Sequence, residues 1–398
     1  MKIAYVTATM PFGNGESFLI AEVTELLKKG IDVIIVPRSP ENSSQVMAPE
    51  LARLAFPAPL LSFPVLWGAM LEALSKPLAT IKAARFLLRC RSPKVFFHNV
   101  AVFPKALWFS RLAACQKVDH IHAHWCSTTA SLALFASTVS GIPWSVTAHR
   151  GDIVANNLLQ VKFENARFVR FISHSGRNLA KSVGADLGKT TAVIVHMGAI
   201  LPEVFKVTAT LSSTPTLLCP ATFFPVKGHK YLLGAIAILR DRGVQCRLQL
   251  AGEGFLYDEL QKQVASLRLE PIVQFMGHLP HSDVMSLYRE NKVDLVILPS
   301  IDLGNGLHEG IPVSLIEAMG YGIPVVSTRT GGIPELLSDG AGVLVPPENA
   351  LALADAIQHI LEDNTERLRL IEAGRSRVMK HFAVESVVAE LLDNFSRY

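Results

Sequence analysis

The sequence predicts an α/β protein with two doubly wound, Rossmann-like domains that face a cleft. Short apolar runs of strand length alternate with amphipathic helical segments, the pattern of a parallel sheet covered on both faces. This alternation occurs twice, and residues 201–215 between the two occurrences show no hydrophobic period and many small polar residues. The chain has 398 residues, 49% of them hydrophobic, which is enough for two cores of ordinary size.

The first half of the chain alternates strands and helices. A helix is expected at 17–29, ended by Gly30, and another at 128–139. The expected strands are residues 2–7, 32–36, 120–124, 144–148 and 168–173.

The second half repeats this rhythm. Its expected strands are residues 217–219, 247–251, 273–275, 295–298, 324–327 and 342–345. Its expected helices are residues 228–242, 256–267, 282–290 and 312–321. We therefore expect an N-terminal domain at 1–200, a linker at 201–215 and a C-terminal domain at 216–375, with a C-terminal helix at 376–398 that packs back on the N-terminal domain. Ligands of such sheets bind beyond the carboxyl ends of the strands.

Charge and cysteine usage exclude some classes of protein. The formal net charge is +4, which is too small to indicate a nucleic-acid partner. Five cysteines are scattered without a CxxC pair, so we expect reduced thiols in a cytoplasmic protein and neither a disulfide framework nor a zinc site.

Segment 54–111 has an unusual composition. Residues 54–71 carry no charge, but three prolines argue against a membrane-spanning helix. Residues 76–111 carry eight lysines and arginines and no acidic residue, with six phenylalanines and tryptophans among them. Two interpretations stay open: peripheral contact with an anionic surface at the inner face of the cytoplasmic membrane, or a buried helical pair with a solvated basic rim.

Residues 306–319 predict an anion-binding helix start. Pro312 suits the first turn of a helix, where its missing N–H costs nothing. Gly310 and Ile311 would present backbone N–H groups at that helix start, and a diphosphate is a natural occupant of such a position.

Two carboxylates flank this helix start. Glu309 lies in the preceding loop, where a negative charge would repel phosphates, so its expected partners are neutral hydroxyl groups, as on a sugar. Glu317 lies in the helix and could bind a second pair of hydroxyls. The pair fits a ligand with a sugar at each end of a diphosphate, although an isolated pair would more often be solvated acids.

Two further positions follow expected strands. Lys227 opens a helix after a strand, where a lysine could counter a diphosphate charge and stabilise a leaving group. Gly252 follows another strand and allows the backbone to approach a ligand closely.

These motifs resemble the retaining glycosyltransferases of family 4, which have the two-domain B-type fold. Glu309 and Glu317 match the Glu-x7-Glu hallmark, within EGIPVSLIEAMGYGIPVVSTRTGGIPELL. Further matching pieces are Lys227-Gly228, AGEG at 251–254, FMG at 275–277, VHMG at 195–198 and VLVPPEN at 343–349. In the N-terminal half, PFGNGESFLIAEVTEL, HIHAHW and SVTAHRGDI resemble the subgroup that builds bacterial exopolysaccharides.

The resemblance implies transfer of a hexosyl group from a nucleoside diphosphate sugar to a hydroxyl acceptor, with the anomeric configuration retained. Glu309 would contact the donor sugar, Glu317 the ribose hydroxyls and Lys227 the diphosphate. Backbone near His278 and Leu279 would hold the base. The other expected donor contacts are Gly15, Thr222, Gly252, Gly310, Ile311, Pro312 and Val313.

The resemblance also places residues on the acceptor side. His149 would lie near the reacting carbon and act with Glu309 and Lys227 in catalysis. Glu16 and Asp152 are the other expected acceptor-side residues, although Asp152 could instead cap a loop. A lipid-linked glycan is the candidate acceptor. No metal or other cofactor is expected, because a lysine and helix N-termini would neutralise the leaving diphosphate.

His122 and His124 alternate along one strand and could share a face as metal ligands. We favour packing or loop contacts for them, because no carboxylate or cysteine cluster lies nearby in the sequence.

One position departs from the family pattern. The family usually has an arginine five residues before the lysine, where this sequence has Thr222. The lost charge-assisted contact could cost about 1.5–3 kcal/mol, unless Arg150 or Lys230 compensates. Otherwise the donor would be bound differently or activity would be low. Two alternatives stay open: a nucleotide-sugar epimerase or phosphorylase on the same fold, and, because of Thr222, a non-catalytic nucleotide-sugar-binding protein.

Overall fold

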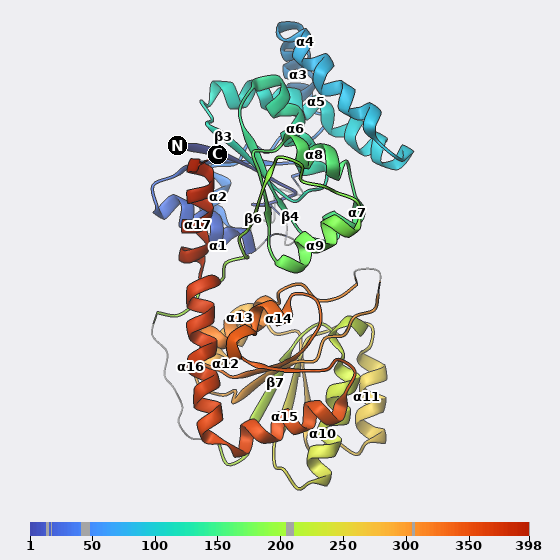
Figure 1. Cartoon of the computed structure of the whole chain (residues 1–398), viewed down its shortest axis with the longest axis vertical. Helices are drawn as coiled ribbons and strands as arrows, with labels where there is room; N and C mark the ends of the chain where they lie inside the picture. The colour runs from blue at the N-terminus through green and yellow to red at the C-terminus, as the bar shows by residue number, and fades with distance from the viewer. Residues whose placement is uncertain (13–15, 17, 41–47, 204–210, 305–306, 398) are drawn as a thin grey trace. The chain divides into compact units, whose positions relative to one another are not determined.

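The computed structural model describes residues 1–12, 16, 18–40, 48–203, 211–304 and 307–397 (Figure 1). The chain divides into two compact units. The first unit is Met1–Gly198 together with Val384–Tyr398, and the second is Ala199–Ala383.

The first unit is built on a six-stranded parallel sheet with the order β2-β1-β3-β4-β5-β6. The strands are β1 (Lys2–Thr7), β2 (Asp32–Pro37), β3 (His120–His124), β4 (Trp144–Ala148), β5 (Phe168–Phe171) and β6 (Thr191–Ile194). β3 and β4 are buried along their whole length, although three of the five residues of β3 are histidines.

Helices surround this sheet. They are α1 (Phe18–Lys28), α2 (Pro49–Ala52), α3 (Phe63–Ser75), α4 (Pro77–Ala84), the 3-10 helix η1 (Arg85–Arg89), α5 (Pro93–Cys115), α6 (Thr128–Ser140), α7 (Arg150–Ala155), α8 (Leu159–Asn165) and α9 (His174–Ser182). Segment 54–111 thus forms a helical subdomain of α3, α4, η1 and α5. Within the described residues, no helix combines the length and apolar character needed to cross a bilayer.

The chain end returns to the first unit as α17 (Val384–Arg397), beside α1 (Figure 1). Val388 and Leu391 of α17 are buried in the same core cluster as Leu19 and Val23 of α1. This helix begins at Val384 instead of 376, because α16 (Asn364–His381) ends where Phe382 leaves the helical conformation and is buried in the second unit.

The second unit is a six-stranded parallel sheet with the order β12-β11-β10-β7-β8-β9. Its strands are β7 (Thr216–Pro220), β8 (Arg247–Ala251), β9 (Val273–Gly277), β10 (Leu295–Leu298), β11 (Val325–Thr328) and β12 (Val343–Val345). Its helices are η2 (Pro225–Lys227), α10 (His229–Asp241), α11 (Tyr257–Ser266), α12 (His281–Arg289), α13 (Val313–Gly320), α14 (Ile333–Leu336), η3 (Ser338–Gly340), α15 (Ala350–Glu362) and α16. Two doubly wound, Rossmann-like units confirm the predicted fold class.

Candidate functional site

The second unit contains a pocket of about 480 Å³ at the carboxyl ends of β7, β8 and β9. Five residues expected to contact a donor line it: Thr222, Gly252, His278, Leu279 and Glu317. The remaining lining residues are Pro220, Ala221, Ala251, Glu253, His281, Val284 and Ser314. The pocket therefore lies where open α/β sheets bind their ligands.

Gly252 allows two loops of this pocket to come together. A Cβ atom at this position would lie 2.1 Å from the carbonyl oxygen of Ala221, so any side chain would collide with backbone. The Gly252 N–H donates to the carbonyl of Gly277 (2.9 Å), which also ties this loop to the end of β9. Glycine at position 252 thus allows the loops after β7 and β8 to pack closely at the strand ends.

Glu317, on α13, is held by a neighbouring histidine. His281 Nε2 lies 2.7 Å from Glu317 Oε1. Burial raises the pKa of the Glu317 carboxyl, and the hydrogen bond from His281 opposes part of that rise. The Glu317 side chain is only 14% exposed, whereas that of His281 is 71% exposed. The carboxylate is thus fixed at the pocket wall by a partner that sequence reasoning missed.

Lys227 and Glu309, both expected at the reacting end of a donor, form an ion pair in the second unit. Lys227 ends η2, directly after β7, and Glu309 lies in the loop before α13. Gly228 has a φ of +68°, and a Cβ atom there would lie 2.0 Å from the carbonyl oxygen of Pro299. Only glycine lets the chain turn from Lys227 into α10 at this contact.

The loop that carries Glu309 packs against two consecutive glycines, Gly331 and Gly332. A Cβ atom on Gly331, whose φ is +53°, would lie 1.8 Å from the Glu309 carbonyl oxygen. A Cβ atom on Gly332 would lie 2.7 Å from the Ile311 side chain. Gly310, Ile311 and Pro312 then lead into α13, which begins at Val313. Glycines at 331 and 332 thus allow this turn to pack closely against the Glu309 loop.

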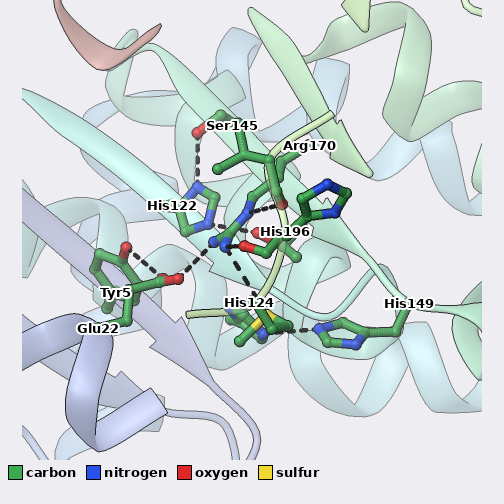
Figure 2. Close-up of polar contacts among 11 residues, drawn as sticks. Tyr5, Glu22, His122, His124, Ser145, His149, Arg170 and His196 are labelled. Carbon is green, nitrogen blue, oxygen red and sulfur yellow. Dashed lines mark hydrogen bonds and ion pairs between the residues drawn. The ribbon is translucent and has the colours of Figure 1, made fainter. Parts of the chain in front are cut away.

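In the first unit, His149 precedes α7 and faces His124 of β3 (Figure 2). Their Nε2 atoms are 2.8 Å apart, and the Trp125 ring centroid lies 4.4 Å from that of His149. Burial lowers the pKa of His149 to about 3 and lowers the pKa of His124 well below its usual value. Both rings are therefore neutral at neutral pH, so one donates and the other accepts.

Asp152 caps the start of α7. Its Oδ2 accepts the N–H of Cys126 (2.9 Å) and, at 3.4 Å, the N–H of His149. Burial raises the pKa of Asp152 to about 6, and these two backbone donors oppose the rise. The loop-capping alternative for Asp152 is thus present in the structure, and its acceptor-side role stays a prediction.

Glu16 is buried and engaged within the fold. Its carboxylate accepts the N–H groups of Ala8 (2.9 Å), Thr9 (2.7 Å) and Met10 (2.8 Å) and the indole N–H of Trp125. Gly15, expected beside it, lies outside the described residues. The Glu16 carboxylate therefore organises the loop after β1, and its acceptor-side role stays a prediction.

Glu16→Ala is expected to destabilise the loop after β1 by about 2–3 kcal/mol, because buried N–H groups lose a charged acceptor. Amide hydrogen exchange at Ala8, Thr9 and Met10 measures this change. Glu50→Ala, at an exposed acidic position of α2, is the matched control. Unchanged protection of these amides in Glu16→Ala would contradict the role assigned to the carboxylate.

A buried polar network lies beside His124 (Figure 2). Arg170 Nη1 pairs with Glu22 Oε2 at 2.6 Å, and Tyr5 donates to the other Glu22 oxygen at 3.0 Å. His122 bonds to Ser145 (2.8 Å) and to Thr147 (2.9 Å). His122 is thus bonded within the sheet, whereas His124 is bonded to His149 at the start of α7. Sequence reasoning missed Arg170 and Glu22, which come from elements 148 positions apart.

Solved structures show which class of fold the two units form. A glycosyltransferase from Rickettsia africae matches with a TM-score of 0.69 at 18% identity, covering 100% of this chain and 98% of that one. HepE from Anabaena, solved in complex with UDP, matches with a TM-score of 0.71 at 16% identity over the full length of both chains. The chain has the two-domain B-type glycosyltransferase fold.

Sequence comparisons match the second unit to a known family. Residues 202–377 match the model of the family "Glycosyl transferases group 1". The amylovoran biosynthesis glycosyltransferase AmsK of Erwinia amylovora is 31% identical over 207 residues, 51% of this chain and 50% of AmsK. The chain thus spans about half the length of this curated relative.

Proposed function

We propose that this protein is a retaining glycosyltransferase that moves a hexosyl group from a nucleoside diphosphate sugar to a hydroxyl acceptor. One observation carries the proposal: in a unit that matches the group 1 glycosyltransferases, Glu317 of α13 lines the pocket at the strand ends, and Glu309, in the loop before α13, pairs with Lys227. UDP bound to the similarly folded HepE supports a nucleotide-sugar donor. AmsK, named for amylovoran biosynthesis, supports a role in bacterial polysaccharide or glycolipid synthesis.

The proposed donor runs from Glu317 to Glu309. The base contacts the backbone near His278 and Leu279, and the ribose hydroxyls donate to Glu317. The diphosphate lies at the start of α13, where helix N–H groups and the Lys227 ammonium favour negative charge. Glu309 accepts from the sugar hydroxyls. In this arrangement no metal is required, since protein cations and dipoles stabilise the leaving group.

The proposed reaction breaks the bond between the anomeric carbon and the diphosphate oxygen. The acceptor oxygen attacks the same face of the sugar, and its proton passes to the departing phosphate. The protein contributes orientation and electrostatic stabilisation. His149, Glu16 and Asp152 remain proposed acceptor-side residues. The proposed location is the cytoplasm, at the inner face of the membrane when the acceptor is a lipid-linked glycan.

A ligand screen tests the donor part of the proposal. A nucleotide sugar that binds the folded state raises the apparent stability, so thermal shifts with UDP, GDP and ADP sugars identify the donor. We expect one class of nucleotide sugar to raise the unfolding midpoint, and Glu317→Gln to reduce that shift. The absence of a shift with every donor would contradict a nucleotide-sugar site.

Incubation with and without an acceptor separates the two alternatives. An epimerase converts the donor sugar without any acceptor, and a non-catalytic binding protein gives a thermal shift without turnover. The proposed transferase releases nucleoside diphosphate in an acceptor-dependent manner.

Thr222→Arg is expected to tighten donor binding roughly tenfold, because it adds a cation at the pocket rim where this chain has only a hydroxyl. Thr222 is exposed and lines the pocket, so a longer side chain has room. Calorimetry with the nucleoside diphosphate measures the change. Thr222→Gln is the control for side-chain length without charge. Equal affinity in the arginine and glutamine variants would show that position 222 does not face the diphosphate.

A further inference from the structure

Helix α3 has two apolar faces, and only one is packed. Val65, Gly68 and Ala69 are buried against α5, where a Cβ atom on Gly68 would lie 2.8 Å from Trp108. The opposite face carries large side chains that are exposed to between 44% and 77%: Phe63, Leu66, Trp67, Met70 and Leu74. Since these residues recur at helical spacing, they form one stripe along α3.

The following helices also carry exposed apolar side chains. Leu78 and Ile81 of α4 and Leu88 of η1 are 82%, 53% and 81% exposed. Twelve of the 22 exposed large hydrophobic side chains among the described residues lie within residues 61–100. Such clustering, unlike scattered single residues, marks an interaction surface. We call the eight residues Phe63, Leu66, Trp67, Met70, Leu74, Leu78, Ile81 and Leu88 the apolar face.

The surroundings of the apolar face are basic. Between Arg53 and Val118 the sequence has a single acidic residue, Glu72. Glu72 is buried, where it accepts from Ser110 (2.8 Å) and pairs with Lys76 (2.9 Å). Six basic side chains are exposed: Lys82, Arg85, Arg89, Arg91, Lys94 and Arg111.

We propose that the apolar face docks into the interface of an anionic bilayer, with the exposed lysines and arginines contacting lipid phosphates. An exposed apolar stripe with basic neighbours and no exposed acid matches the chemistry of that surface. A second copy of this chain would present the same positive rim, and like charges oppose such self-association. The occupant is therefore a lipid surface, consistent with the position of α3, α4 and α5 at one end of the first unit (Figure 1).

Trp67 provides a direct probe of this docking. It is 51% exposed, whereas Trp108 and Trp125 are half-buried and Trp144 is buried. The full chain is mixed with vesicles of phosphatidylcholine alone or of phosphatidylcholine with phosphatidylglycerol. We expect flotation with the anionic vesicles and a blue shift of tryptophan emission that Trp67→Phe removes.

Paired variants test the two parts of the surface. Trp67→Ser with Leu74→Ser removes exposed apolar area without opening a core, so the fold is retained. Arg85→Gln with Arg89→Gln and Arg91→Gln removes three charges, each worth roughly fivefold in partitioning, or about 100-fold together. The matched controls are Leu351→Ser, an exposed leucine of α15, and Lys262→Gln, an exposed lysine of α11.

Loss of flotation in both test variants, with wild-type behaviour of both controls, would support the proposal. Failure of the wild-type chain to float with anionic vesicles, or a dimer in solution that Trp67→Ser with Leu74→Ser dissociates, would overturn it. The membrane proposal does not rest on the transfer reaction. A chain that shows donor-dependent thermal shifts but does not bind vesicles would therefore refute membrane docking and leave the proposed donor site unaffected.

Discussion

Glu309→Gln is expected to lower turnover by on the order of 10²- to 10³-fold while the second unit stays folded. The substitution keeps the size of the side chain and removes the charge that accepts from sugar hydroxyls in the proposed complex. Lys227 loses its ion-pair partner, but its side chain is 21% exposed and can be solvated. The backbone of the loop is held independently by the contacts at Gly331 and Gly332.

Steady-state kinetics with a saturating donor measures this effect, and the unfolding midpoint checks the fold. Glu259→Gln, an exposed glutamate of α11, is the matched control. Near-parental turnover of a folded Glu309→Gln protein would remove Glu309 from the catalytic site.

Lys227→Ala should have an effect of similar size, because it removes the side-chain cation proposed to stabilise the leaving diphosphate. Lys227→Arg keeps the charge and is expected to recover part of the activity, although its planar head group does not reproduce an ammonium. Lys262→Ala, at an exposed lysine of α11, is the control.

The ion pair leads to a further prediction for the variants of Lys227 and Glu309. Lys227 and Glu309 contact each other, so the effects of their substitutions on the activation free energy of turnover should not be additive. The double variant should raise that free energy by less than the sum of the two single increases. Strict additivity in turnover would indicate that the two side chains act separately. A folded Lys227→Ala protein with unchanged turnover would contradict the role of the lysine.

Most strands and several helix starts could be predicted from local patterns, but β6, whose four residues are only half-buried, was not among the expected strands. Apolar runs place β8 and β10 at the expected residues, and the expected helix after Lys227 begins at His229 because Gly228 adopts a positive φ. These features depend on a few consecutive residues. The lining of the pocket could be predicted for the same reason, since Thr222, Gly252 and His278 each lie within two residues of a strand end.

The pairing of distant side chains could not be predicted. The bond from His281 to Glu317 and the buried pair of Arg170 with Glu22 depend on strand order and helix position, which no local pattern specifies. The break between α16 and α17 was missed because Phe382, an apolar residue, leaves the helix to be buried. The exposed stripe of α3 was also missed as a face, because both sides of that helix are apolar.

Proton NMR of a nucleotide sugar incubated with the full chain, with and without a lipid-linked hydroxyl acceptor, tests the central claim most directly. The account predicts that the donor is consumed only when the acceptor is present. It also predicts a glycoside whose anomeric coupling matches that of the donor. Conversion of the donor without acceptor, an inverted product, or an unchanged donor under every condition would contradict it.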